Sequence, residues 1–248
     1  MTSSDGAGRA GDASTRASVP VLEARHLTAG YGEVPVLHDI SLRVGTGQIV
    51  ALLGANGAGK TTLLLALAGR LPLLSGHVAA DGHVTTAPLY RRARDGLGLV
   101  TDDRSIFRSL TAIDNLRVGR VQVDDALELF PELKPRLGVI AGLLSGGEQQ
   151  MLTLARALAR QPKVLLIDEL SLGLAPQIVQ RLLARLSEAA TRSGTGVLLV
   201  EQHIRKALAA ADYGYILSRG RITLEGTAMT LRDRMSEIES SYLTGGTS

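Results

Sequence analysis

The sequence predicts an α/β fold with a mostly parallel central sheet, an antiparallel β subdomain before it and an α-helical subdomain inserted in it. Apolar runs at 48–53, 164–167 and 196–200 are nearly continuous and alternate with helical patterns. Such runs are typical of strands buried on both faces of a parallel sheet. Residues 103–160, by contrast, carry mostly helical signals. This order of strands, helices and strands sets the fold class.

The chain opens with short apolar runs separated by glycine and other turn residues, which indicates antiparallel strands joined by tight turns. These runs predict strands at Val21–Ala24 and Tyr31–Leu37, a hairpin at Ser75–Val84 around Asp81-Gly82, and a short core strand at Gly98–Val100.

Helical patterns follow the strands. They span 61–71, Ser109 or Thr111 (as the N-cap) to Leu116, Asp124 (as the N-cap) to Phe130, Met151–Arg160 and Gln177–Ser193. The last of these lies between two buried strands, which is the βαβ order of a parallel sheet.

Composition excludes several classes of function. The chain has 248 residues, of which 45% are hydrophobic and 21% charged, with no cysteine and a net charge of +3. Without cysteine there can be no disulfide, thiolate metal site or cysteine nucleophile. The small positive charge does not provide the dense basic face that nucleic-acid binders need, so we expect no nucleic-acid partner. No apolar stretch approaches the length of a membrane span, so we expect a soluble chain.

We expect a single domain over residues 21–243, with the helical subdomain inserted at about 103–160. Residues 1–20 are rich in Ser, Gly, Ala and Thr, and cannot bury enough apolar surface to offset the entropy lost on ordering. They predict a flexible tail, and residues 244–248 predict a frayed end.

The segment Gly54-Ala55-Asn56-Gly57-Ala58-Gly59-Lys60-Thr61 fits the phosphate-binding loop pattern. It follows a predicted buried strand and precedes a helix. Glycines let backbone N–H groups converge on phosphate oxygens at a helix N-terminus, where the dipole also favours an anion. Lys60 would neutralise the β- and γ-phosphates, and the Thr61 hydroxyl would ligate Mg²⁺.

Two carboxylates, Asp168 and Glu169, follow the apolar run at 164–167. In open α/β sheets ligands lie at this carboxyl end of the strands. Asp168 is suited to the Mg²⁺ shell and Glu169 to polarising the attacking water.

A second anion site is predicted where Leu144-Ser145-Gly146-Gly147-Glu148-Gln149-Gln150 precedes a helical pattern. Ser145, Gly146 and Gly147 would form a nest of backbone N–H groups at the helix N-terminus.

The phosphate loop, the LSGGEQQ segment and the Asp-Glu pair, in this order and spacing, resemble the nucleotide-binding subunits of ABC transporters. The resemblance extends from about Val21 to Leu243. It implies a P-loop NTPase core of the RecA-like type, ATP and Mg²⁺ as cofactors, and hydrolysis in a head-to-tail pair of chains. It also implies a catalytic group comprising Glu169, Gln202 and Lys60, and nucleotide contacts from Tyr31, Gly54, Asn56, Gly57, Gly59, Lys60, Thr61, Thr62, Ser145, Gly146, Gly147 and Asp168.

The sequence departs from the family pattern at three positions. Asp102 aligns where the family usually has a glutamine, and its carboxylate is a candidate Mg²⁺ ligand beside Thr61 and Asp168. At the switch position, alignment from the last strand gives Gln202, with His203 one residue later on the other face. Leu170 replaces the usual proline before Ser171-Leu172-Gly173-Leu174-Ala175-Pro176.

Within the family, Val200-Glu201-Gln202, the SLGLAP segment, Arg104 and Tyr242-Leu243 resemble ATPase subunits of branched-chain amino-acid importers, and importers of related amides share these features. The resemblance implies a second ATPase subunit, identical or paralogous, permease subunits in the membrane, an indirect link to a solute-binding protein and a peripheral place on the cytoplasmic face.

Two readings from other classes remain as alternatives. One is an ABC ATPase without a transport role. The other is a small-molecule kinase or GTPase, which LSGGEQQ argues against. His26, His38, His77 and His83 predict surface residues, and the arginines at 91, 92, 94, 104, 108, 117 and 120 predict a solvated face that leaves room for contact with membrane-protein loops.

Overall fold

The computed structural model describes residues 19–103 and 105–244. The expected tail at 1–20 and frayed end at 244–248 fall almost entirely outside this part, as does Arg104, so these remain predictions.

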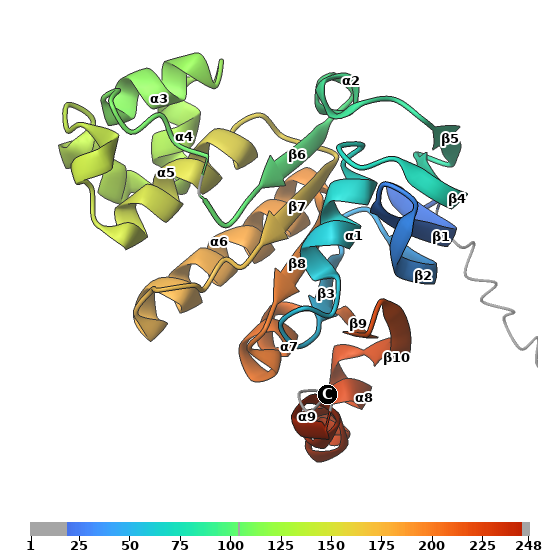
Figure 1. Cartoon of the computed structure of the whole chain (residues 1–248). Coiled ribbons are helices and arrows are strands. Elements are labelled where there is room, and N and C mark those ends of the chain that lie inside the picture. Colours follow the sequence, from blue (N-terminus) through green and yellow to red (C-terminus); the bar gives the residue numbers. More distant parts are fainter. Residues whose placement is uncertain (1–18, 104, 245–248) are drawn as a thin grey trace, which may run out of the picture.

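Two sheets form the framework (Figure 1), and their topology confirms the predicted fold class. The antiparallel sheet has the order β2 (Val34–Val44), β1 (Leu22–Tyr31), β4 (Leu73–Ala80), β5 (His83–Thr85). The larger sheet has the order β10 (Arg221–Thr227), β9 (Tyr213–Ser218), β3 (Ile49–Leu53), β8 (Gly196–Glu201), β7 (Val164–Asp168), β6 (Leu97–Val100). All of its pairs are parallel except β9 with β10.

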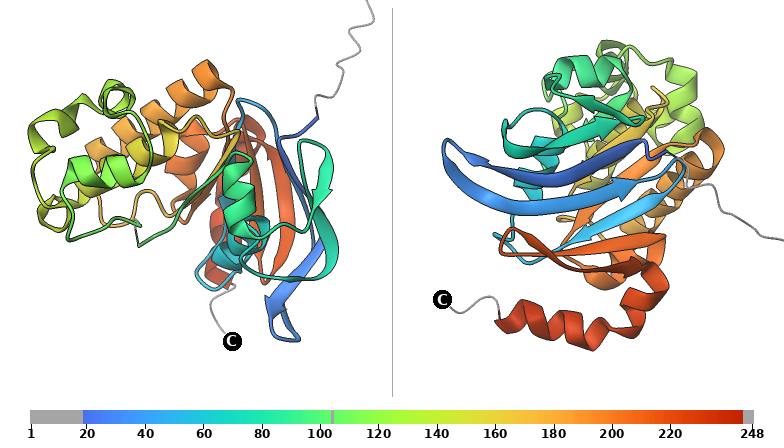
Figure 2. Two further views of the ribbon diagram at one scale, coloured as in Figure 1. Left: turned by 90° about the horizontal axis from the view of Figure 1, so that it is seen from above. Right: turned by 90° about the vertical axis from the view of Figure 1, so that its right-hand side faces the viewer.

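Helices cover both faces of the larger sheet. Helix α1 (Lys60–Leu67) contacts β1, β2 and β7 and so lies between the two sheets. The opposite face carries α6 (Pro176–Ser193), α7 (Ile204–Ala210) and α8 (Ala228–Asp233), and α9 (Met235–Thr244) follows α8. The helical subdomain holds α3 (Ala112–Val118), α4 (Val123–Leu129), short 3-10 turns at Pro131–Arg136 and Ala141–Leu143, and α5 (Gly146–Leu158). It lies to one side of the sheet in Figure 1 and in the left view of Figure 2.

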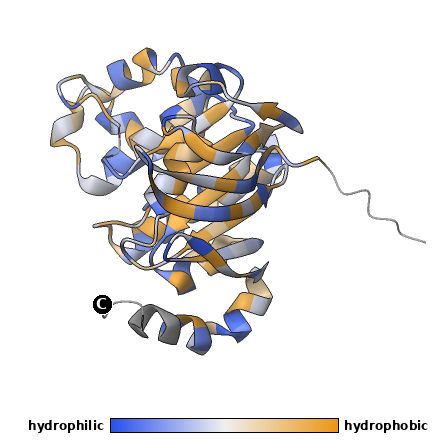
Figure 3. Ribbon diagram, turned by 45° about the vertical axis from the view of Figure 1, so that its right-hand side comes forward, coloured by the Kyte–Doolittle hydropathy of each residue, from blue (hydrophilic) through white to orange (hydrophobic). Residues whose placement is uncertain are grey.

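The central strand β3 shows why its apolar run is continuous. Ile49, Ala51 and Leu53 pack into the core shared with the helices, whereas Val50 and Leu52 pack into the core shared with α1 and the antiparallel sheet. In Figure 3 the strands at the centre of the molecule are mainly hydrophobic, whereas the outer elements are more polar. Two faces of one strand therefore join two cores.

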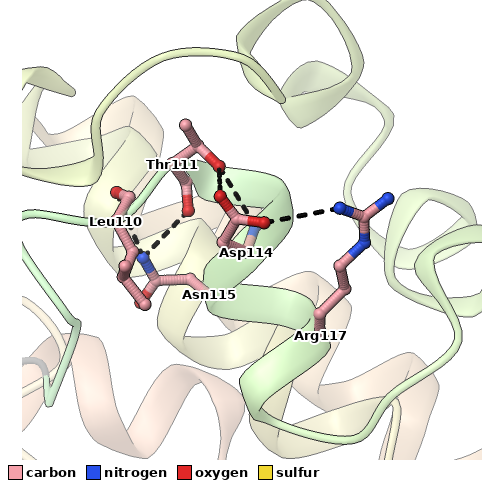
Figure 4. Close-up of polar contacts among 5 residues, drawn as sticks. All are labelled: Leu110, Thr111, Asp114, Asn115 and Arg117. Carbon is pink, nitrogen blue, oxygen red and sulfur yellow. Dashed lines mark hydrogen bonds and ion pairs between the residues drawn. The ribbon is translucent and has the colours of Figure 1, made fainter.

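Helix α3 begins at the predicted cap Thr111, whose hydroxyl accepts a hydrogen bond from the Asp114 amide at 3.2 Å (Figure 4). Buried Asn115 then donates to the carbonyls of Phe107 and Thr111, both at 3.0 Å, and its own oxygen accepts from the Phe107 amide at 2.9 Å. The loop after β6 is thus fastened to the first turn of α3.

Several predicted boundaries were wrong. The helix predicted over 61–71 is α1, which ends at Leu67 shortly before Gly69 turns left-handed at φ 74°. The strand predicted at Tyr31–Leu37 is interrupted by the turn between β1, which ends at Tyr31, and β2, which begins at Val34. Asp124 does not cap α4, because the helix begins at Val123 and Asp124 lies in its first turn. Helix α5 begins at Gly146 and not at Met151, because Ser145 and Glu148 form a reciprocal capping box. The same helix ends at Leu158, shortly before Gln161 turns left-handed at φ 48°.

Helix α2 (Leu89–Arg94) corrects the expectation that all the arginines at 91–120 are solvated. Arg92 is only 7% exposed, and its guanidinium donates to the carbonyls of Leu67 at 2.6 Å and Ala87 at 2.7 Å. Burial lowers the pKa of Arg92. This side chain closes the C-terminal end of α1, so its role is structural.

Candidate nucleotide-binding site

The loop between β3 and α1 turns sharply enough to require glycine at particular positions. Gly59 has φ 104°, a left-handed conformation that suits glycine, and a Cβ atom there would lie 2.9 Å from Leu37. A Cβ atom on Gly54 would lie 2.5 Å from the carbonyl oxygen of Leu217. Asn56 and Gly57 at the crest are exposed, and Thr62 on α1 is buried. The loop therefore presents its crest to solvent at the start of a helix.

Lys60 is buried at the base of this loop and bends back over it. Its ammonium donates to the carbonyl oxygens of Gly54 at 2.8 Å and Ala55 at 3.1 Å. Desolvation lowers the pKa of Lys60, while the charges of Glu169, Asp168 and Glu201 oppose that shift. The cation thus lies among carboxylates from β7 and β8.

Asp168, at the end of β7, is 2% exposed and faces the first turn of α1. Its Oδ2 accepts a hydrogen bond from the Thr61 hydroxyl at 2.8 Å, whereas its buried Oδ1 has no hydrogen-bond partner. Desolvation raises the pKa of Asp168, the Thr61 bond opposes this, and the charges of Glu169 and Asp102 add to it. The arrangement leaves one buried carboxylate oxygen available to a ligand.

A hard cation fits these donors. Mg²⁺ prefers oxygen ligands, and proteins usually supply only one or two carboxylates while substrate phosphates and water complete the shell. Asp168 Oδ1 and the Thr61 hydroxyl are donors of this kind. Within residues 19–103 and 105–244 no cluster of three acidic or histidine side chains could hold a metal by itself.

Glu169 and Gln202 extend from neighbouring strand ends and meet. Gln202 Nε2 donates a hydrogen bond to Glu169 Oε1, and the Glu169 amide donates to the Val200 carbonyl at 3.0 Å. Glu169 has φ 48°, which is uncommon for a residue with a side chain. His203 is exposed and lies at the start of α7. The structure thus brings Gln202, not His203, to the carboxylate pair.

Two other predicted residues lie at the margin of the site. Asp102 is exposed in the loop after β6, close enough to Asp168 for its charge to contribute to the pKa shift. Tyr31 is 57% exposed at the end of β1, so it is not a core tyrosine. It pairs with Val34 beside the turn of the hairpin, and β2 reaches the phosphate loop through Val36 and Leu37 next to Gly59.

Ser145, Gly146 and Gly147 form the first turn of α5, on the other side of β7 from α1 (Figures 1 and 2). The Ser145 amide donates to Glu148 Oε2 at 2.8 Å, and Ser145 Oγ accepts from the Glu148 amide at 3.3 Å. Arg136 also binds Glu148, at 2.6 Å, and this hydrogen bond lowers the pKa of Glu148. In one chain Ser145 is exposed, Gly146 and Gly147 are half-buried, and the turn lies away from the phosphate loop.

Sequence reasoning missed one residue beside the site. Glu201 is 4% exposed and accepts hydrogen bonds from the Ser171 amide and hydroxyl, both at 2.9 Å. A glutamate after an apolar strand resembles an ordinary exposed strand end, so the sequence alone carried little signal.

None of the helices in the described part combines the length and apolarity that a membrane crossing needs.

Known proteins are similar to this chain in sequence and in fold. The family profile described as "ABC transporter" matches residues 37–171 of the chain. The chain belongs to the ABC transporter family. Within that family it is of the ATP-binding subunit type, and such subunits hydrolyse ATP, so the chain is an ATP hydrolase.

Two ABC transporter subunits are similar to the chain in sequence, and one solved structure is similar in fold. The chain is 43% identical over 225 residues to the high-affinity branched-chain amino acid transport ATP-binding protein BraG of Pseudomonas aeruginosa, covering 87% of this chain and 96% of BraG. It is 37% identical over 221 residues to the lipopolysaccharide export system ATP-binding protein LptB of Escherichia coli strain K12, covering 83% of this chain and 90% of LptB. A solved ATP-binding subunit of an ABC transporter superposes with a TM-score of 0.77 at 26% identity, covering 90% of this chain and 99% of that one.

Proposed function

We propose that the chain energises uptake of a small solute, a branched-chain amino acid or a related amide, by binding and hydrolysing ATP. The observation that carries the solute class is the 43% identity to BraG across nearly the whole of that protein. The similarity to LptB makes export of a lipid-linked solute the competing candidate. In either case the chain would sit peripherally on the cytoplasmic face of the membrane.

The residues divide the work of hydrolysis among them. Backbone N–H groups of the phosphate loop, with Tyr31 beside it, hold ATP, and Lys60 leaves its loop carbonyls to neutralise the phosphates. Asp168 and Thr61 would hold Mg²⁺, which neutralises charge on the phosphates, and Asp102 would contact its water shell. Glu169 accepts the proton of the attacking water, and Gln202 orients Glu169 and senses the γ-phosphate.

A second ATPase subunit completes the site. The first turn of α5 lies on the other side of β7 from α1 of its own chain. The Ser145 amide is bonded to Glu148, so we assign the anion nest to the amides of Gly146 and Gly147 beside the exposed Ser145 side chain. A head-to-tail pair would place each nest against the ATP held by the partner, because a two-fold axis makes the two composite sites equivalent.

Permease subunits have a candidate contact surface in the groove between the helical subdomain and β6. It has a volume of about 450 Å³ and is lined by Arg70, Arg94, Arg156, Arg160 and Asp103 among others. Its excess of arginine favours loops that carry acidic residues. A solute-binding protein would act through the permease and not touch this chain.

The transport assignment can be tested in the cell of origin. Deleting the chain should abolish ATP-dependent uptake of radiolabelled leucine, isoleucine and valine, while lysine uptake stays unchanged. The wild-type chain should restore uptake and Glu169→Gln should not. Normal uptake in the deletion strain, together with a defective outer envelope, would favour export instead.

Ser145→Arg tests the shared site. The bulky cation should block closure of the pair, so ATP turnover should fall at least about tenfold while ATP affinity of the isolated chain stays within about threefold. Mixing Ser145→Arg with Lys60→Ala should recover part of the activity, because one composite site of the mixed pair carries neither change. Loss of ATP binding by the Ser145→Arg monomer would contradict the head-to-tail arrangement.

A further inference from the structure

The ends of β7 and β8 stay connected beyond the last paired residues of the sheet. Asp168 pairs with Val200 in the sheet, and the Glu169 amide still reaches the Val200 carbonyl at 3.0 Å. Next, Glu169 and Gln202 are joined through their side chains. Last, the Glu201 carboxylate accepts hydrogen bonds from the amide and the hydroxyl of Ser171, both at 2.9 Å. The chain segments that carry Glu169 and Gln202 thus form one cross-linked unit.

The two hydrogen bonds between Ser171 and Glu201 are buried inside the protein. Ser171 is 6% exposed and Glu201 is 4% exposed. Burial raises the pKa of Glu201, whereas the hydrogen bonds from Ser171 and the charge of His203 oppose that shift. A carboxylate costs free energy when it is buried, and its hydrogen bonds offset part of that cost. Packing alone would be served better by an apolar residue, so the carboxylate at this position calls for another explanation.

The position of Ser171 offers one. It lies two residues after Glu169, whose φ of 48° belongs to a conformation that a side chain disfavours. Beyond Ser171 the loop becomes exposed at Leu172 and reaches α6 at Pro176. Leu170 is buried in the core, so Ser171 is the last anchored residue before the loop becomes exposed. Loss of the hydrogen bonds at Ser171 would loosen the loop and let the Glu169 carboxylate rotate away from Gln202.

We infer that Glu201 is a positioning residue for ATP hydrolysis: by clamping Ser171 it fixes the loop after β7 and keeps the Glu169 carboxylate facing Gln202. The inference rests on the proposed role of Glu169 as the base. Glu201 itself acts through Ser171 and does not touch the reacting atoms. Displacements of about 1 Å at a reacting group are enough to slow an enzyme markedly, so the clamp should affect turnover more than binding.

Four variants of the full chain test the clamp. Ser171→Ala removes one of the two hydrogen bonds, and Glu201→Ala removes both. Glu201→Gln preserves them, because its carbonyl oxygen can accept from the Ser171 amide while its NH₂ group donates to Ser171 Oγ. Thr195→Val is the matched control, since it removes a buried hydroxyl bond of 2.8 Å to Pro162 at the opposite ends of the same two strands.

The readout is the split between kcat and KM for ATP. Glu201→Ala and Ser171→Ala should lower kcat by about tenfold and about fivefold, with KM within about threefold of wild type. Glu201→Gln should retain at least about a third of kcat, and Thr195→Val should retain nearly all of it. If Glu201→Ala does not fold, Ser171→Ala still decides, because it only trims a hydroxyl.

Two results would overturn the inference. The first is turnover in Ser171→Ala and Glu201→Ala no lower than in Thr195→Val. The second is a loss in Glu201→Gln as large as in Glu201→Ala, which would assign the effect to charge. Glu169→Gln, measured alongside, separates the proposals: normal turnover there contradicts the role of Glu169 and the clamp with it, whereas lost turnover there and normal clamp variants contradict the clamp alone.

Discussion

The two ends of the six-stranded sheet differ in how they treat buried polar groups. At the amino ends of the strands, the Thr195 hydroxyl binds the Pro162 carbonyl at 2.8 Å, and Asp212 accepts from the Ile49 amide at 2.8 Å. At the carboxyl ends, Asp168 keeps a buried oxygen without a partner, and Glu169 holds a disfavoured backbone conformation.

The fold loses stability at the carboxyl ends of the strands. An unpartnered buried oxygen or a strained φ raises the free energy of the folded state by about 1–3 kcal/mol each. A left-handed φ occurs at both ends, because Gln161 before β7 has φ 48° as well, so the contrast rests on the buried oxygen. The carboxyl ends therefore combine a phosphate loop with a buried carboxylate oxygen that a ligand could complete.

Glu169→Gln should produce the largest difference between the two ends. The amide keeps the size of the side chain but cannot accept a proton, so turnover should fall at least about 100-fold while ATP binding persists. Steady-state hydrolysis and calorimetric titration with ATP measure the two quantities. Near-normal turnover would remove Glu169 from the catalytic group.

Lys60→Ala should act on binding first. The ammonium faces the phosphates before and during the reaction, and a charged hydrogen bond contributes about 1.5–3 kcal/mol, so the Kd for ATP should rise about 10- to 100-fold. Calorimetry on the purified chain measures this. An unchanged Kd would mean that Lys60 stays on its own loop carbonyls with ATP bound.

Gln202→Ala should slow hydrolysis about 10- to 100-fold, the effect of one hydrogen bond to a carboxylate, because it releases Glu169. His203→Ala is the neighbouring control and should leave turnover near wild type, since His203 is exposed. The reverse order of the two effects would place the γ-phosphate sensor one residue later than Gln202.

Asp168→Asn should raise stability in the absence of nucleotide and Mg²⁺, by about 1 kcal/mol or roughly 2–4 °C in Tm. Desolvation raises the pKa of Asp168 above its unfolded value. The wild-type carboxylate therefore destabilises the fold increasingly as pH rises through the folded pKa, and the advantage of the variant should shrink as pH falls below it. Asp212→Asn, at the other end of the sheet, should not stabilise. Thermal unfolding at several pH values measures both.

The sequence predicted those features that depend on local pattern. Continuous apolar runs located β3, β7 and β8, and the glycine spacing located the phosphate loop, because each pattern has few physical alternatives. The same kind of pattern narrowed the cap of α3 to Ser109 or Thr111, and the structure selects Thr111. Helix α5 started earlier than expected because the Ser145–Glu148 capping box, a recognisable pattern, outweighed two glycines in its first turn.

Features that depend on contacts between distant segments were not predictable in the same way. Arg92 and Glu201 carry charges, which usually lie at the surface, yet both are buried by partners 25 and 30 residues away along the chain. The meeting of Gln202 with Glu169 likewise depends on two strands lying side by side. Residue type predicts the average environment, and tertiary neighbours decide the exceptions.

The position of β3 at the centre of the sheet has a consequence for synthesis on the ribosome. Its neighbours are β8 and β9, and Ile49 pairs with Val197, about 150 residues later. At 5–20 residues per second, roughly 8–30 s pass before the first of these neighbours emerges. During that time the β1–β2 hairpin can form, but an apolar strand is left without its partners and is prone to aggregate. Nascent chains of this protein should therefore depend on chaperones until the last third of the sequence has been made.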